Sequence, residues 1–171
     1  GLAKGTIYLY VASKEELFLA VLEQQFADWF TAVDAQLHAL GGAQGVDPAV
    51  AAIADALIAQ PHLVRLFTIA HAVLEPNVGL EPIVRFKQLL AERLNRTGAL
   101  LEATVGTLTP GSGAAILLNA YALAVGLKSM ADPPPALADA LTADPGLAAF
   151  QIAFAPAFTV ALAALIRGWQ P

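Results

Sequence analysis

Prolines and glycines divide this chain into segments in which apolar residues recur at helical spacing. Gly41-Gly42 ends the first long apolar stripe, and Asp47-Pro48 begins the next segment. Pro133-Pro134-Pro135 and Asp144-Pro145 separate the last two segments. Alanine and leucine are abundant, and no strand-like alternation persists. The sequence therefore predicts an all-α protein with about six substantial helices after a short first one.

The clearest helix start is the sequence Ser13-Lys14-Glu15-Glu16, which is a capping box. It predicts a helix over residues 14–40, about 40 Å long at 1.5 Å per residue. Pro156 should kink the last predicted helix, because proline removes a backbone hydrogen bond. The other helices are expected from Asp47-Pro48, from Pro61 to Pro76, from about Pro82 to Glu102, from Thr109-Pro110 to about Met130, and from Asp144-Pro145 to about Trp169.

The composition narrows the function classes. The chain is 57% hydrophobic and only 13% charged, which excludes disorder for most of it. It has no cysteine, which excludes disulfides, thiolate zinc sites and thiol catalysis. Residues 1–14 carry two lysines and no acid, whereas the rest carries 7 basic and 14 acidic residues. Any contact with DNA is therefore expected from the first fourteen residues.

Two long stretches without charge, residues 103–127 and 145–166, raise the question of a membrane span. Residues 107–113 interrupt the first stretch with threonine, proline, serine and glycine. Alanine dominates the second, and alanine suits close helix packing better than lipid contact. We therefore expect helices buried by their neighbours or by a second subunit, and no membrane partner. A small helical membrane or lipid-handling protein is the alternative.

The first seventeen residues, GLAKGTIYLYVASKEEL, carry the most specific signal in the chain. They resemble the end of the helix-turn-helix in TetR/AcrR-type transcriptional regulators, whose pattern is close to GVSKGTLYxYFxSKEEL. The resemblance implies a partial DNA-binding unit over residues 1–12 and an effector-binding and dimerisation domain over residues 13–171. It also implies that Ile7 packs inward, that Lys4, Gly5 and Thr6 lie near base edges, and that Tyr8, Tyr10 and Lys14 hold the phosphate backbone.

The segment departs from the family pattern at two positions. Ala3 stands where a serine or threonine cap is frequent, and Val11 stands where phenylalanine is common. The family's first helix and most of its second are expected ahead of Gly1. Without that scaffold, the 171 residues are predicted to bind operator DNA poorly, and binding is expected when the full N-terminal region is present.

The resemblance also implies what the body does. It predicts a cytoplasmic regulator, in the first instance a repressor, in which a small molecule moves the helix over residues 14–40 and so changes the spacing of two recognition helices. Residues 114–130 and 145–169 are expected to form half of a four-helix bundle in a homodimer. A helical dimer that serves only as an interaction module, with no effector, is a further alternative.

The effector pocket is expected among the helices of residues 48–125. Few polar residues lie near the apolar faces there, which suits a small, largely apolar ligand with one or two polar groups. His71 lies on an apolar stripe, where a core histidine is the commoner role. The candidate effector-binding residues are Phe26, Phe30, Phe67, His71, Phe86, Leu90, Arg93, Asn119 and Tyr121, with Gln60 as a further polar group.

No motif in the sequence favours an enzyme. His71 and Glu75 are four residues apart, and His62 is near, but there is no HExxH pattern or carboxylate cluster. Gly111-Ser112-Gly113 lacks the pattern of a nucleophile elbow. We therefore predict no catalytic residues, no metal site and no cofactor.

Overall fold

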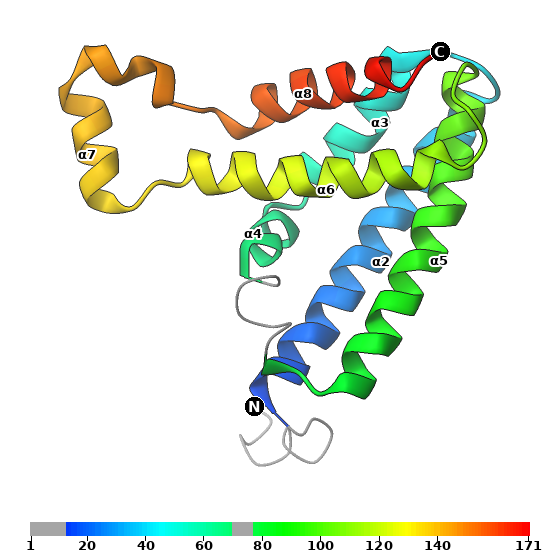
Figure 1. Cartoon of the computed structure of the whole chain (residues 1–171), viewed down its shortest axis with the longest axis horizontal. Helices are drawn as coiled ribbons and strands as arrows, with labels where there is room; N and C mark the ends of the chain where they lie inside the picture. Colours follow the sequence, from blue (N-terminus) through cyan, green and yellow to red (C-terminus); the bar gives the residue numbers. More distant parts are fainter. Residues whose placement is uncertain (1–12, 70–76) are drawn as a thin grey trace.

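The computed structural model describes residues 13–69 and 77–171, and these residues form an all-α fold. The all-α prediction is confirmed. Two long helices lie side by side, a second pair crosses one end of them, and a short helical arm projects from that second pair (Figure 1). The elements are α2 (Lys14–Leu40), α3 (Val46–Ile58), α4 (Pro61–Ile69), α5 (Leu80–Val105), α6 (Ser112–Ala131), α7 (Pro135–Ala143), the 3-10 helix η3 (Pro145–Phe150) and α8 (Phe154–Gly168).

The boundaries of α2 follow from local chemistry. The Ser13 hydroxyl accepts a hydrogen bond from the backbone N–H of Glu16 at 3.1 Å, as the capping box predicts. At the other end, Gly41 has a φ of 64°, a left-handed conformation that favours glycine and ends the helix. The predicted range, 14–40, is the range observed.

A buried polar contact joins α2 to α5. Asp34 on α2 is buried, and its Oδ1 accepts a hydrogen bond from the Thr97 hydroxyl at 2.5 Å. Its Oδ2 lies 3.0 Å from Nε of Arg96, whose side chain is largely exposed. Because both carboxylate oxygens have partners, the charge can be buried, and the contact fixes how α2 and α5 align along their axes.

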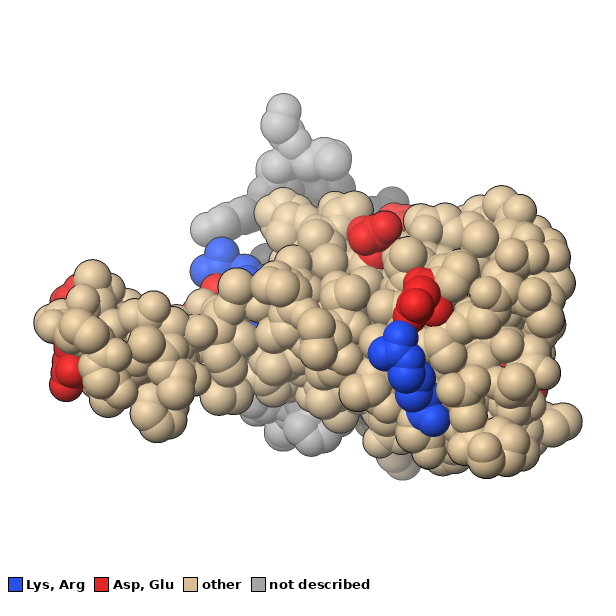
Figure 2. All heavy atoms as spheres, turned by 90° about the horizontal axis from the view of Figure 1, so that it is seen from above, with Lys and Arg blue, Asp and Glu red and all other residues tan. Residues whose placement is uncertain are grey.

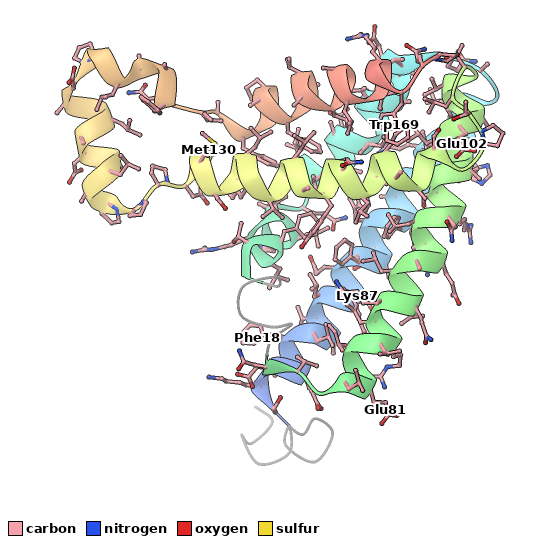
Figure 3. The ribbon with its side chains drawn as sticks, viewed as in Figure 1. Phe18, Glu81, Lys87, Glu102, Met130 and Trp169 are labelled. Carbon is pink, nitrogen blue, oxygen red and sulfur yellow. The ribbon has the colours of Figure 1, made fainter. Side chains whose placement is uncertain are left out.

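The start of α6 meets α5 backbone to backbone. A Cβ atom added to Gly98 would lie 2.5 Å from the backbone nitrogen of Ala114, and one added to Gly113 would overlap the backbone of Gly98. Glu102 Oε1 accepts a hydrogen bond from the Gly113 N–H at 2.7 Å (Figure 3). The Glu102 carboxylate thus satisfies an amide at the start of α6, where backbone N–H groups have no acceptor within the helix.

The C-terminal helices differ most from expectation. The predicted helix over residues 145–169 is wrong in its first part, because η3 ends at Phe150 and α8 begins only at Phe154. Pro156 is then the third residue of α8. The N–H groups of the first turn have no acceptor within the helix, so a proline there removes no hydrogen bond and does not kink α8. Similarly, Pro133-Pro134-Pro135 ends one helix and starts another, because α7 begins at Pro135.

The projecting arm consists of α7 and η3, which pack mainly on each other (Figure 1). Asp144 joins them, and its carboxylate accepts from the Gly146 N–H at 2.8 Å. Leu141 is buried in the arm, whereas Leu137 and Phe150 are 49% and 60% exposed. The arm therefore carries apolar surface that the described part of the chain leaves uncovered.

Removing the Asp34 carboxylate tests the link between α2 and α5. We expect Asp34→Ala to lower the free energy of unfolding by about 2 kcal/mol, since it leaves the buried Thr97 hydroxyl without its acceptor. Urea denaturation measures the change. Asp28→Ala, on an exposed position of the same helix, is the matched control and should change stability by less than about 0.5 kcal/mol. Equal effects of the two substitutions would contradict a structural role for Asp34.

Candidate functional site

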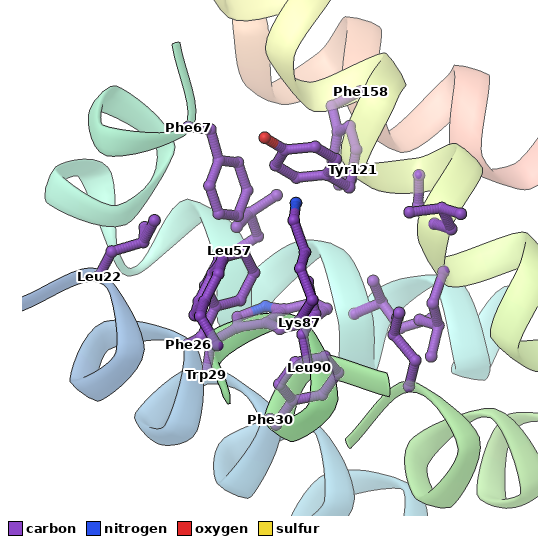
Figure 4. Close-up of a pocket in the computed structure, with 16 residues that line it drawn as sticks. Leu22, Phe26, Trp29, Phe30, Leu57, Phe67, Lys87, Leu90, Tyr121 and Phe158 are labelled. Carbon is purple, nitrogen blue, oxygen red and sulfur yellow. The ribbon is translucent and has the colours of Figure 1, made fainter. Parts of the chain in front are cut away.

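A cavity of about 200 Å³ lies where α6 diverges from the α2–α5 pair (Figure 4). Helices α2, α3, α4, α5, α6 and α8 all contribute to its wall. Almost every lining side chain is apolar or aromatic, which is typical of a small-molecule site. The lining residues are Leu22, Phe26, Trp29, Phe30, Ile53, Leu57, Phe67, Phe86, Lys87, Leu90, Leu94, Leu117, Leu118, Ala120, Tyr121 and Phe158.

Helical periodicity explains why these residues meet. On α2, Leu22, Phe26 and Trp29 are four and three residues apart, so they share one face. On α5, Phe86, Leu90 and Leu94 follow at intervals of four and also share a face. The two faces lie toward each other because α2 and α5 pack along their lengths (Figure 1).

Phe26 is the centre of an aromatic cluster in the wall. Its ring centroid lies 5.0 Å from that of Phe67, 6.1 Å from that of Phe86 and 6.3 Å from that of Tyr121. Phe67 and Tyr121 are themselves in edge contact, with centroids 4.8 Å apart. These contacts join α2 to α4, α5 and α6, so a ligand that displaces one ring acts on several helices at once.

Among the described lining residues, three carry polar groups. The Lys87 side chain extends among the aromatic rings, with its nitrogen directed toward the side lined by Phe67 and Tyr121 (Figure 4). Its Nζ lies 5.7 Å from the ring centroid of Phe86. Tyr121 contributes a hydroxyl. Trp29 is only 6% exposed, and its indole Nε1 is buried with no hydrogen-bond partner among the residues that the structure describes.

The structure places six of the nine predicted effector residues in this wall: Phe26, Phe30, Phe67, Phe86, Leu90 and Tyr121. Arg93 lines a smaller neighbouring cavity together with Glu23. Asn119 does not lie in the pocket as expected; it is exposed on α6, and its side-chain amide donates to the Ala115 carbonyl at 2.9 Å. His71 lies outside the described residues, and Gln60 does not line the cavity.

The sequence reading missed two polar lining residues, Trp29 and Lys87. Trp29 is three residues after Phe26, so its position on the same face was a usable signal. Lys87 gave no such signal, because a lysine beside an apolar stripe usually faces water. Its stem lies along apolar surface here, and this follows from tertiary packing alone.

The DNA-binding residues implied by the resemblance are almost all at positions the structure does not describe. Lys4, Gly5, Thr6, Ile7, Tyr8 and Tyr10 fall within residues 1–12. Lys14 is described and is the first residue of α2. Its ammonium is exposed and lies 3.7 Å from Glu15 Oε1, so it is accessible to a phosphate.

In the described ranges, 13–69 and 77–171, no three His, Cys, Asp or Glu side chains gather as they would around a metal ion. His71 and Glu75 lie outside those ranges. Of the helices described, α6 is the single one that is long and apolar enough to cross a membrane, and the bent pair α3–α4 passes the same test jointly. A core helix of a soluble protein passes it as well.

Comparison with known families decides the family of this fold. The profile described as "Tetracyclin repressor-like, C-terminal domain" matches residues 23–171. The chain belongs to the TetR family. Its TetR-like domain includes every helix that lines the cavity, and only the first nine residues of α2 precede the match. Proteins of this family are regulators, generally without enzymatic activity, and typically act as dimers that bind DNA and small ligands. No curated protein sequence matches the chain.

A neutral apolar probe of one ring tests whether the cavity accepts ligands. We expect toluene to bind saturably, with one site per chain, as followed by titration calorimetry, because an apolar cavity of about 150 Å³ already holds benzene. Leu90→Trp should weaken binding by about tenfold, since the larger side chain fills the cavity. Leu80→Trp is the control on the same helix, because Leu80 is 80% exposed and outside the wall. A probe that binds both variants equally well would contradict this location.

Proposed function

We propose that this chain is the effector-binding and dimerisation part of a cytoplasmic TetR-family transcriptional repressor that responds to a small, largely apolar ligand. The observation that carries the proposal is the apolar cavity with α2 in its wall. The helix that would follow the recognition helix is thus the same helix that a ligand would touch. We also propose that residues 1–12 belong to the DNA-binding unit and that residues 13–171 form the effector-binding and dimerisation domain.

The proposed mechanism is a movement of α2. Lys14, at its start, is nearest in sequence to the recognition segment, and Phe26 lies in the cavity wall. A ligand shifts the equilibrium only if it binds one position of α2 better than the other. In a dimer, recognition helices must reach half-sites about 34–36 Å apart, so a displacement of a few ångströms disfavours simultaneous contact.

We propose that the dimer forms through residues 114–130 and 145–169. Seen from above, the surface over α8 is largely uncharged (Figure 2). Val160 on α8 is 71% exposed, and Met130 at the end of α6 is 51% exposed. A second copy related by twofold symmetry would cover this surface, and the projecting α7–η3 arm extends the apolar area available to it.

A regulator explains the uncharged sequence of α6 better than a membrane protein does. Helix α6 packs against α4, α5 and α8 and contributes Leu117 and Tyr121 to the cavity. A helix that packs against other helices of its own chain on several sides, and against a second copy of the chain on the remaining side, needs an uncharged sequence. The chain's family supports the same choice.

A charge on the proposed interface should prevent dimerisation. We expect the parent chain to have twice the 17.7-kDa chain mass in size-exclusion chromatography with light scattering. Val160→Asp should shift it to the monomer, because the interface would bury an unpaired carboxylate. Val84→Asp, at a 44% exposed position of α5, is the control and should remain dimeric. A monomeric parent, or a dimeric Val160→Asp variant, would exclude this interface.

Lys14 tests the proposed DNA contact. In the regulator with a complete helix-turn-helix, Lys14→Ala should weaken binding to duplexes selected from a random pool about equally for every sequence. The slope of log affinity against log salt should fall by about 1, as for one lost phosphate contact. Lys128→Ala is the control. Lys128 lies on α6, outside the proposed DNA-binding segment, and its ammonium already pairs with the Asp132 carboxylate at 2.8 Å. An unchanged slope for Lys14→Ala would argue against a phosphate contact.

A further inference from the structure

One buried donor in the cavity wall has no acceptor. Trp29 lines the cavity and is more than nine-tenths buried, and its Nε1 has no hydrogen-bond partner among the residues that the structure describes. The nitrogen lies among the lining side chains (Figure 4). An indole N–H can only donate, so an acceptor is what it lacks. Buried donors without an acceptor are rare in folded proteins, and each needs an explanation.

The side chains around the cavity do not supply this acceptor. The other polar groups of the described wall, on Lys87 and Tyr121, each have an interaction within the protein. The Phe30 ring meets the Trp29 ring edge-on, with centroids 4.7 Å apart, and an aromatic face is only a weak acceptor. Trp29 is therefore the group in the described wall that a bound acceptor would satisfy.

Two buried acceptors elsewhere are also unpaired among the described residues. They are Glu23 Oε1 and Gln60 Oε1. Neither residue lines this cavity, and Glu23 belongs to the smaller cavity beside it. The acceptor for Trp29 is thus expected from a molecule inside the cavity.

An oxygen on an apolar body suits this position better than a water molecule does. A buried water needs about two to four polar partners, whereas Trp29 offers one donor in a largely apolar wall. One uncharged donor also does not compensate for the cost of burying an anion. The group that Trp29 fits is therefore an uncharged acceptor.

We propose that the cavity binds a neutral one-ring compound whose uncharged oxygen, such as that of a ketone, accepts a hydrogen bond from Trp29 Nε1. The ring of the ligand lies against the aromatic side chains of the wall, which include Phe26 and Phe67. A volume of about 200 Å³ admits one ring with a short substituent, since about 150 Å³ holds benzene. The inference rests on the proposed function, since it names the ligand class of the same cavity.

The position of this donor connects the ligand to α2. Trp29 belongs to α2, the helix whose movement the proposed function requires. A hydrocarbon would fill the cavity without a hydrogen bond to this helix, whereas a ketone oxygen would bond to it directly. The acceptor therefore gives the ligand a contact that depends on where α2 lies, which is what a shift of the equilibrium requires.

A matched pair of neutral ligands tests the hydrogen bond by titration calorimetry. Acetophenone and 2-phenylpropene have nearly the same shape, and a methylene group replaces the carbonyl oxygen in the second. Trp29→Phe should weaken acetophenone binding about fivefold relative to 2-phenylpropene binding, because it removes the donor and keeps an aromatic ring. The relative change is the readout, since the ketone loses more hydration on binding and both ligands feel any change in packing.

Trp169→Phe is the matched control, because Trp169 is 38% exposed and lies outside the wall. It should leave the ratio of the two affinities unchanged. Equal weakening of both ligands by Trp29→Phe, or no weakening of either, would overturn the assignment of Trp29.

A nuclear magnetic resonance measurement makes the same test without altering Trp29. The chain has two tryptophans, so Trp169→Phe leaves a single indole N–H resonance, that of Trp29. Acetophenone should move this proton downfield of its position in the 2-phenylpropene complex, because a carbonyl acceptor deshields it while both ligands carry the same ring. The same position in both complexes would rule out the hydrogen bond. If neither ligand binds, the proposed function fails; if both bind and the carbonyl has no effect, this inference alone fails.

Discussion

The arrangement of the molecule depends on two consecutive residues of α5. Thr97 donates to the buried Asp34 of α2, and Gly98 touches the backbone of α6 at Gly113 and Ala114. Two adjacent residues of α5 therefore make the contacts that position α2 and α6. A side chain at Gly98 would force α6 away, and without the Asp34 carboxylate α2 would lose its polar attachment. Beyond this point α6 diverges from α5, and the aromatic residues fill the space between them.

The cavity is a consequence of that divergence. Tyr121 is eight residues beyond Gly113 along α6, and Phe86 is twelve residues before Gly98 along α5, which are separations of about 12 and 18 Å. Rings from α2 and α4 occupy most of the wedge, and the remaining volume is the cavity. Along α2, Phe26 is about 12 Å from Asp34 and Lys14 is about 30 Å from it. If α2 turns as a rigid rod about Asp34, a ligand that moves it by 1 Å at Phe26 would displace Lys14 by about 2.5 Å.

Local chemistry explains which parts of this could be predicted from sequence. The limits of α2 depend on Ser13 and Gly41, which act within a few residues, and they were predicted correctly. Six of the wall residues were among the apolar and aromatic candidates for the pocket that the family resemblance implied. Pro156 was misread because a proline in the first turn and one in the helix interior look alike until the helix start is known. Asn119 was expected in the pocket and lies outside it, whereas Lys87 contributes to the wall without having been predicted. Which way each side chain faces depends on packing between helices distant in sequence.

Helix α6 shows why composition alone could not separate a regulator from a membrane protein. Its inner face must supply Leu117 and Tyr121 to the cavity, and its start must be small enough to contact Gly98. Its outer face must be uncharged if a second copy is to cover it. These three requirements remove charged residues from nearly the whole helix, which then has the length and hydropathy of a membrane span. If that second copy is present, packing demands on two sides account for the low charge of α6.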